Sequence, residues 1–307
     1  NVIFFTNLKK LNYFYQESLL NKMESNLEVF NLPINLKTKH NIVDKNIFTE
    51  IYINPLKLKI ENNLNYNKKG FNGELNFNLI NKDETVSYSL KNESLIFNTK
   101  DNKLSGEINI KPFFLLANLD LQGARIKELY KNDSIIVNLL KSEIFNNKNL
   151  NGKISVKVDN LDDLKNIGVI KFDIQFEEGL VFISNLNFLY KNFLIFDFND
   201  SNLVVDNNQL KFIGDIVIDF KNIENFYSHF QIKRSYRRNI DQINSSFIFN
   251  LDDKIFELNE LKIKGVNVNK QILDKYLNDF NSKEKDFFNN VTIRNTVRNF
   301  FKIISSD

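Results

Sequence analysis

The most regular feature of the chain is a strict alternation of apolar and polar residues over short runs. In Ile170–Phe176 (IKFDIQF), the isoleucines and phenylalanines occupy every second position, and Lys171, Asp173 and Gln175 lie between them. Because successive side chains of an extended strand leave opposite faces, this run predicts a strand with one apolar face and one hydrated face. Similar runs recur along most of the chain.

These runs fill two segments, which we interpret as a first β-meander at residues 28–123 and a second at residues 148–265. Turn-forming residues separate consecutive runs at Asp101–Lys103, Asp206–Asn208 and Asp252-Asp253. Parallel strands would need long crossover connections, so short turns predict an antiparallel sheet in which each strand pairs with the next. The predicted fold class is therefore mainly β, with flanking and inserted helices.

Three segments show helical spacing instead. Residues 1–27 are predicted to form an amphipathic helix with a linker, because Phe4, Leu8, Leu11, Tyr15, Leu19 and Met23 recur every three or four positions. Residues 124–147 predict an inserted helix or helix pair, with Asn132-Asp133-Ser134 as a possible N-cap. Residues 266–307 predict C-terminal helices at 268–280 and 286–304.

Composition narrows the class of protein. Hydrophobic residues make up 42% of the 307 residues and charged residues 26%, which is normal for a globular chain. The 30 Phe accompany abundant Asn, Lys and Ile and only 9 Gly and 3 Pro, the bias expected of an AT-rich bacterial genome. The phenylalanine count alone is therefore a weak functional signal.

Charge and cysteine content exclude several function classes. A net charge of +3 is too small to predict a nucleic-acid partner. The absence of cysteine excludes disulfides and thiolate catalysis, and it suits an oxidising envelope compartment. No run approaches the ~20 apolar residues of a membrane span. The chain begins Asn-Val-Ile without Met, so we expect a fragment whose targeting or anchoring segment lies upstream.

The sequence contains few recognisable catalytic or metal-binding motifs. His40 and His229 are far apart and lack metal-ligand spacing, and the glycines are scattered singly rather than gathered in a phosphate loop. Adjacent acidic residues on a strand point to opposite faces, so pairs such as Glu177-Glu178 make poor acid/base dyads. We therefore expect no enzyme, cofactor or metal site, although an enzyme on a β scaffold stays open as the weakest alternative.

Two groups of basic residues are candidates for contact with lipid headgroups or a membrane surface. Guanidinium groups bind phosphate bidentately, and tyrosine suits a headgroup region. We favour the alternative interpretation of each group: a solvated loop between strands for the first, and packing of the helix on the sheet for the second. The candidates are Lys233, Arg234, Tyr236, Arg237 and Arg238 in the first group, and Arg294 and Arg298 in the second.

Several segments resemble the AsmA-like family of bacterial envelope proteins, which are relatives of TamB. The resemblance lies in Gly73–Leu79, Ser105–Pro112, Leu139–Val158 and Phe172–Phe220, where strands open with a motif of the type N-G-x-L/I-x-F/V. It covers roughly residues 50–265. The chain differs from the family in lacking the N-terminal membrane helix and in its low-glycine, phenylalanine-rich composition.

The resemblance implies a long, twisted sheet curled into an open groove whose concave face is apolar. Such proteins are anchored at the inner membrane, project into the periplasm and are implicated in moving phospholipid towards the outer membrane. The implied partners are phospholipid acyl chains, a membrane surface and other envelope proteins. The candidate lining residues are Leu75, Phe77, Ile108, Ile110, Phe172, Ile174, Phe176, Phe212, Ile216, Ile218, Phe220, Phe247 and Phe249.

The same apolar faces could instead pack together as the core of a closed β-sandwich. In that case the protein would be a structural or adhesive module that binds other proteins through its strand edges. The exposure of the apolar faces distinguishes the two interpretations.

Overall fold

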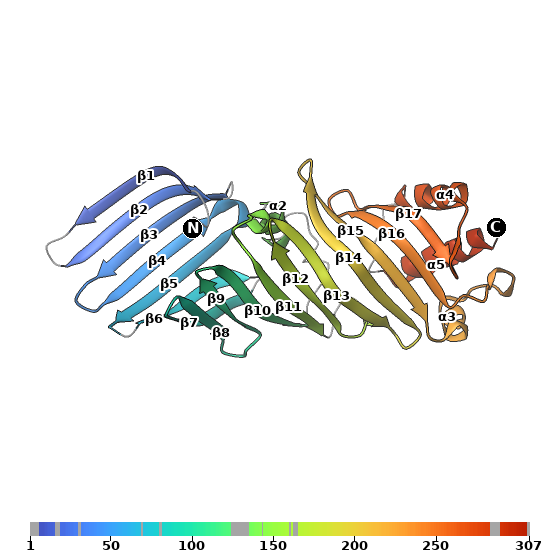
Figure 1. Ribbon diagram of the computed structural model, residues 1–307, viewed down its shortest axis with the longest axis horizontal. Helices are drawn as coiled ribbons and strands as arrows, with labels where there is room; N and C mark the ends of the chain where they lie inside the picture. The colour runs from blue at the N-terminus through green and yellow to red at the C-terminus, as the bar shows by residue number, and fades with distance from the viewer. Residues whose placement is uncertain are drawn as a thin grey trace. The chain divides into compact units, whose positions relative to one another are not determined.

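A computed structural model gives the architecture of the chain (Figure 1). It describes residues 6–15, 19–29, 32–68, 70–79, 82–123, 135–142, 144–159, 161, 165–282 and 289–305. The fold is mainly β, as the alternating runs predict, and the described strands belong to one sheet of 18 strands. The chain divides into two compact units, which we describe separately: unit 1 comprises Asn1–Asp120, Glu128–Val156 and Gln175–Val181, and unit 2 comprises Leu121–Lys127, Lys157–Ile174 and Phe182–Asp307.

Unit 1 is built on an antiparallel meander in which each strand pairs with the next one along the chain. The prediction of an antiparallel sheet joined by short turns is confirmed here (Figure 1). Two 3-10 turns, η1 (Asn54–Leu56) and η2 (Ile144–Asn146), and helix α2 (Ile135–Lys141) accompany the sheet. Its strands are β1 (Thr6–Tyr15), β2 (Leu20–Val29), β3 (Leu32–Asn41), β4 (Asn46–Ile53), β5 (Leu58–Asn67), β6 (Gly70–Leu79), β7 (Lys82–Lys91), β8 (Ser94–Thr99), β9 (Leu104–Ile110) and β10 (Phe113–Gln122).

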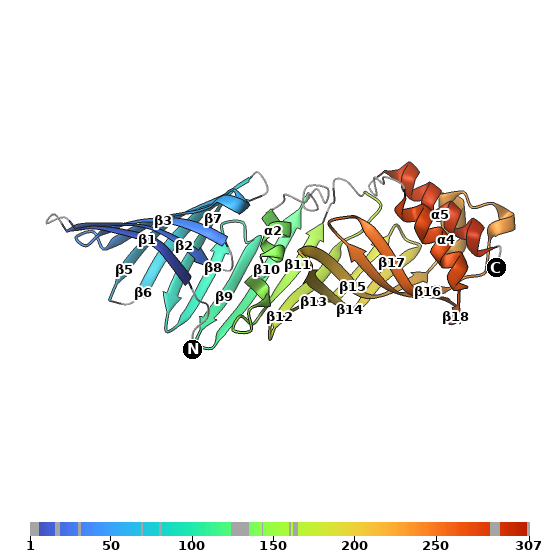
Figure 2. The ribbon, with the colours of Figure 1, turned by 90° about the horizontal axis from the view of Figure 1, so that it is seen from above.

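Unit 2 combines long antiparallel strands with helices. Strands β14 to β18 pair consecutively, and helices α3, α4 and α5 pack beside them (Figure 2). Strands β10, β11, β12 and β13 each contribute residues to both units. The elements are β11 (Gly152–Asp159), β12 (Ile170–Glu177), β13 (Leu180–Tyr190), β14 (Leu194–Asp206), β15 (Gln209–Phe220), α3 (Ile223–Phe230), η3 (Arg234–Tyr236), β16 (Gln242–Asn250), β17 (Ile255–Ile263), β18 (Val266–Asn267), α4 (Lys270–Asn281) and α5 (Asn290–Ile304).

The turns lie where the sequence predicts them. Asn207 and Asn208, with φ of 49° and 61°, join β14 to β15, and two consecutive positive φ angles are the geometry of a tight hairpin. Between β8 and β9, Asp101 Oδ1 accepts hydrogen bonds from Thr99 Oγ1 (2.8 Å) and Lys103 N (3.2 Å). The hydrogen bonds from Lys103 and Thr99 lower the pKa of the exposed Asp101 carboxyl to about 2. The carboxylate form therefore organises this turn.

The prediction of an N-terminal helix in residues 1–27 is wrong for the residues described. They form the hairpin of β1 and β2, in which Tyr13 pairs with Met23. A register shift between Leu8 and Lys10 explains the misleading spacing, because a bulge of this kind puts residues three apart on one face of a strand. Leu8 and Leu11 therefore share a face although their separation imitates one helical turn.

The other helix predictions have mixed outcomes. Helix α2 occupies part of the predicted insertion, whereas residues 124–134, including the possible N-cap, lie outside the described residues. The C-terminal helices are confirmed as α4 and α5. Helix α3, which was not predicted, forms before the first basic group, with Asn222 as its N-cap, whose side chain accepts a hydrogen bond from Asn225 N (2.9 Å). The basic group itself lies in the connection between α3 and β16.

The main core lies in unit 2, between one face of the sheet and the helices. Phe226 and Tyr227 of α3 and Phe301 of α5 are almost fully buried, and Leu261 of β17 meets them from the sheet. The Tyr227 and Phe301 rings meet edge to face with centroids 5.6 Å apart. Three helices thus seal the apolar face of strands β14, β16 and β17 at this place.

Candidate functional site: the apolar face of unit 1

The strand registers of unit 1 place apolar side chains from successive strands on one face. Leu36 pairs with Ile51, and Ile51 pairs with Ile60 on the next strand. Directly paired residues in an antiparallel sheet project to the same side. Following the registers from strand to strand gives one continuous face, which we call the unit 1 apolar face. It includes Leu11, Leu27, Leu36, Ile47, Ile51, Ile60, Leu64, Leu75, Phe77, Tyr88, Leu90, Leu95, Phe97, Ile108, Ile110 and Leu115.

The side chains of this face remain partly exposed. Among the described apolar residues of β1 to β10, only Leu32, Val86 and Ala117 are buried. Leu56 of η1 and Val137 of α2 are also buried, where these short elements meet near β3. A sheet packed against a second sheet would bury its inward side chains far more completely. Within the described residues, the unit 1 apolar face is not the inside of a sealed sandwich.

Several polar side chains on the same face bond to one another. His40 Nε2 lies 2.9 Å from Tyr66 Oη, and Tyr88 Oη donates to Asn62 Oδ1 at 2.6 Å. Burial raises the pKa of the Tyr88 hydroxyl, which favours the protonated form that donates this hydrogen bond. Polar groups that satisfy each other cost less when an apolar molecule covers them than unpaired groups would.

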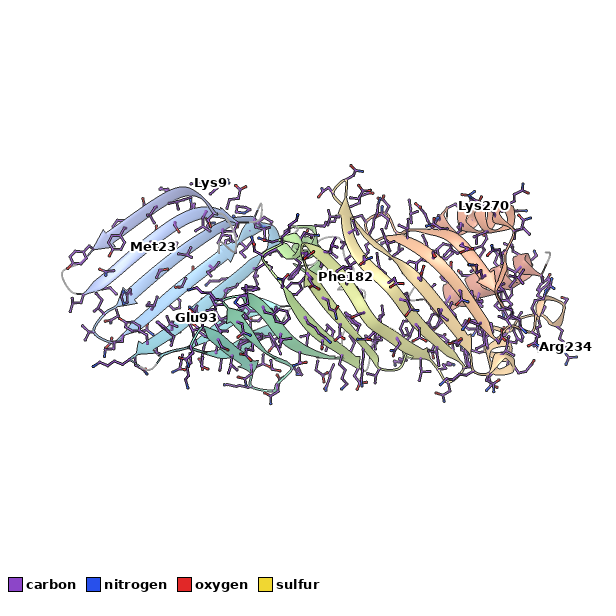
Figure 3. All side chains as sticks on the ribbon, viewed as in Figure 1. Lys9, Met23, Glu93, Phe182, Arg234 and Lys270 are labelled. Carbon is purple, nitrogen blue, oxygen red and sulfur yellow. The ribbon has the colours of Figure 1, made fainter. Side chains whose placement is uncertain are left out.

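The opposite face of the same strands is ionic. Lys37 pairs with Glu24 across β2 and β3 at 3.7 Å, and Lys59 lies 3.6 Å from Glu50 and 2.7 Å from Glu61. Figure 3 labels Lys9 of β1 and Met23 of β2 among the side chains of these strands. Lys9 also pairs with Glu28 on this side. Such exposed pairs contribute little stability but keep this face hydrated.

Four of the lining residues predicted from the sequence lie on the unit 1 apolar face and are partly exposed: Leu75, Phe77, Ile108 and Ile110. Phe176 is 2% exposed, because it packs against Gly152 and its ring lies 5.3 Å from that of Phe145 in η2. Its neighbours Phe172 and Ile174 on β12 are partly exposed.

The remaining predicted lining residues lie in unit 2, where their environments differ. Phe247 is 2% exposed inside an aromatic cluster with Phe212, whose ring centroid is 5.2 Å away. Ile218 and Phe220 pack against the core that the helices cover. Phe212, Ile216 and Phe249 keep partial exposure. Phe176 and Phe247 are therefore core residues in this structure, whereas the candidates on the unit 1 apolar face contact solvent.

The first basic group contains residues of two kinds. Arg237 lies over the Tyr227 ring, 5.3 Å from its centroid, and its Nε donates to Ile232 O at 3.1 Å. Arg238 Nη2 donates to Ser305 O at 3.0 Å, and Tyr236 packs against the core. Within the described residues, the exposed Lys233 and Arg234 side chains form no ion pair or hydrogen bond. Arg237, Arg238 and Tyr236 thus hold η3 against the helices.

Arg298 of the second group connects two helices. Its Nε donates to Phe230 O, the last residue of α3, at 2.8 Å, and a second nitrogen contacts Gln231. A cation at a helix C-terminus compensates the unpaired carbonyls there. Arg294 lies one turn earlier on α5, near His229, and desolvation together with the positive charges of Lys191 and Arg294 lowers the pKa of that imidazole.

Both histidines contact other side chains of the chain. His229 contacts Tyr190 Oη at 3.3 Å and Lys191 Nζ at 3.1 Å, and His40 bonds to Tyr66. Across the described ranges, no three His, Cys, Asp or Glu side chains come together in a way that could hold a metal ion.

Sequence analysis missed most of the unit 1 apolar face. The alternation in Ile47–Ile53 was the available signal, since Ile47, Thr49, Ile51 and Ile53 occupy every second position. Phe48 and Tyr52 fall between them, so both faces of β4 carry apolar residues and the pattern is weaker. The paired residues of the neighbouring strands decide which of the two faces is continuous.

Comparisons with known proteins give no relative. No family model matches the chain, and neither a curated protein nor a solved structure does so. None of the helices in the described part of the chain is both long and apolar enough to span a membrane.

Proposed function

We propose that this protein is a non-enzymatic lipid-transfer protein, which holds phospholipid acyl chains on the unit 1 apolar face. The observation that carries the proposal is the partial exposure of this ten-strand face, on which few apolar side chains are buried. In unit 2, by contrast, helices α3, α4 and α5 cover the apolar residues of the strands. Large exposed apolar surfaces on folded proteins usually mark a binding surface.

The energetics favour an acyl chain as occupant. Each methylene exposed to water costs about 0.8 kcal/mol, so a chain with 14 methylenes costs about 11 kcal/mol in transit between membranes. A ten-residue strand spans roughly 33 Å, about twice the ~15 Å hydrocarbon depth of one bilayer leaflet. The face can therefore shield a whole chain. Apolar contacts are non-directional and let the chain slide.

The proposed setting is the bacterial envelope, with transport of phospholipid between the inner and outer membranes. The resemblance to the AsmA-like family supports this setting. The absence of cysteine is compatible with an oxidising periplasm. Anchoring to the inner membrane belongs to the same proposal.

The decisive test compares the two faces of β4. The double variant Ile47→Asn/Ile51→Asn places amides on the unit 1 apolar face, and Phe48→Asn/Tyr52→Asn makes the matched change on the opposite face. Vesicles that contain fluorescent phosphatidylethanolamine serve as donors in a transfer assay, and native mass spectrometry records bound phospholipid. We expect the first variant to lose transfer and lipid adducts and the second to retain both.

Equal loss in both variants, with intact circular dichroism, would overturn the proposal. An unliganded mass together with no transfer by the natural chain would also overturn it.

One observation favours a second candidate, a protein-binding module that pairs through its first strand: Leu8, Tyr13 and Tyr15 of β1 are exposed by 58%, 59% and 66%. For this candidate the same mass spectra would show a dimer in place of lipid adducts.

A further inference from the structure

A pocket of about 490 Å³ lies at one end of the unit 1 apolar face. It is lined by the turn between β5 and β6, the turn between β7 and β8, and the turn between β9 and β10. Such a volume is typical of sites for small molecules and headgroups. All of its lining residues belong to unit 1.

The apolar part of the pocket continues the unit 1 apolar face. Phe71 pairs with Leu90, and Ile110 follows Ile108 on the same side of β9. Gly70, with φ of 149°, allows the close approach of the chain here, because a Cβ atom at this position would lie 2.8 Å from Leu90 O. The pocket therefore opens beside the surface proposed to hold acyl chains.

The charged part of the pocket is basic. Lys68, Lys91 and Lys111 come from the three turns and share the lining with a single carboxylate, that of Glu93, which gives a net charge of +2. Glu93 Oε1 lies 3.4 Å from Lys111 Nζ, and Figure 3 labels Glu93. Among the described residues, Lys68 and Lys91 have no carboxylate or other side-chain partner. Two lysines are thus available to an anion.

We propose that this pocket binds the headgroup of an anionic phospholipid such as phosphatidylglycerol, while the acyl chains of the same molecule lie on the unit 1 apolar face. The inference rests on the proposed function and adds the lipid class and its orientation. Lysine ammonium groups attract a phosphate as point charges, and the adjacent apolar side chains take the start of the acyl chains. A zwitterionic headgroup gains less binding energy from this positively charged rim than an anionic headgroup does.

The test measures the dissociation constants of two short-chain lipids, dihexanoyl phosphatidylglycerol and dihexanoyl phosphatidylcholine, by calorimetry below their micelle concentrations. We expect the natural chain to bind the anionic lipid about tenfold more tightly at about 0.05 M salt, and this ratio to shrink as salt screens the exposed lysines. The variant Lys68→Glu/Lys91→Glu is expected to abolish the ratio, because it removes both unpaired ammonium groups from the pocket and weakens the binding of phosphatidylglycerol.

The control variant Lys39→Glu/Lys100→Glu makes the same change in net charge at exposed positions of unit 1 outside the pocket, and we expect it to keep the ratio. Equal binding of both lipids by the natural chain, or an equal loss of the ratio in both variants, would overturn the headgroup site and leave the proposed function standing. Binding of neither lipid would contradict the proposed function itself. Glycerol phosphate that binds as tightly as phosphatidylglycerol would identify a site for free phosphate and overturn the lipid assignment.

Discussion

At the scale of single residues, close contacts rather than charges fix the path of the long strands in unit 2. Ser201 of β14 is almost fully buried and lies at a register shift between Asn199 and Asn202. Gly214 on β15 faces it, and a Cβ atom there would come 2.4 Å from Ser201 Oγ and 2.9 Å from Ser201 Cα. The absence of a side chain at residue 214 is what lets the two strands stay paired across the bulge.

This contact predicts the effect of a single methyl group. Gly214→Ala should lower the free energy of unfolding by about 1–3 kcal/mol, because the added Cβ overlaps backbone and side-chain atoms in a packed site. Gly168→Ala is the matched control, since its Cβ would meet no atom nearer than 3.6 Å, at Leu189 Cβ. Urea denaturation followed by circular dichroism measures both. Equal midpoints for the two variants would show that β14 shifts freely to accommodate the methyl group.

At the scale of elements, the helices of unit 2 owe their place to one amphipathic face each. On α5, Phe301 is 1% exposed and contacts Phe226 and Tyr227 of α3. Val291, in the first turn of the same helix, is 63% exposed. Substitutions at these two positions therefore distinguish the contribution of packing to the stability of α5 from that of its intrinsic helix propensity.

We expect Phe301→Ala to destabilise unit 2 by about 3–5 kcal/mol, because a large side chain leaves a cavity among rings that cannot close around it. Val291→Ala should change the stability by less than about 0.5 kcal/mol. Chemical denaturation monitored by tyrosine fluorescence gives both values. A small effect at Phe301 would mean that α5 is only loosely attached to the sheet.

The elements also show how far the sequence predicts the structure. Strands that alternate regularly, such as β9 and β12, could be predicted because the period of two is uninterrupted. The hairpin of β1 and β2 could not, because the bulge after Leu8 replaces that period with a spacing typical of a helix. Helix α3 left a detectable signal, namely Ile223, Phe226, Tyr227 and Phe230 at helical spacing after the capping Asn222.

The candidate site was less predictable than the strands. Alternation identifies two faces for each strand, but only the register between strands shows which faces join. The exposure of a side chain depends on what packs above its face. Phe77 and Phe247 both lie in alternating runs, but Phe77 is partly exposed and Phe247 is buried. The basic pocket could not be predicted at all, because Lys68, Lys91 and Lys111 lie in three separate turns.

At the scale of the whole molecule, the two units differ in how completely they bury their apolar residues. Most of the buried aromatic side chains lie in unit 2, around α3 and α5. The strands of unit 1 depend mainly on their hydrogen-bonded ladders and on partly exposed contacts. Local stability follows the density of buried apolar contacts, so the units should open with different free energies.

Hydrogen exchange measured by mass spectrometry checks this expectation. The amides of β3, β4 and β5 should exchange at least about tenfold faster than those of β15 and β16 when no lipid is present. Addition of phosphatidylglycerol should slow β3 to β5 selectively, because a ligand stabilises the state that binds it. Uniform exchange across these five strands, or protection of both regions by lipid, would contradict the difference between the units.

The meander of unit 1 also constrains how such a protein can change length during evolution. Each strand pairs with its neighbours in sequence, so the loss or duplication of a whole hairpin keeps every remaining strand in its direction. Loss of one strand would reverse all the strands that follow it, and insertion of one residue within a strand would exchange its two faces. Viable relatives should therefore differ by pairs of strands, and the apolar face of their sheet should lengthen or shorten in steps of two strands.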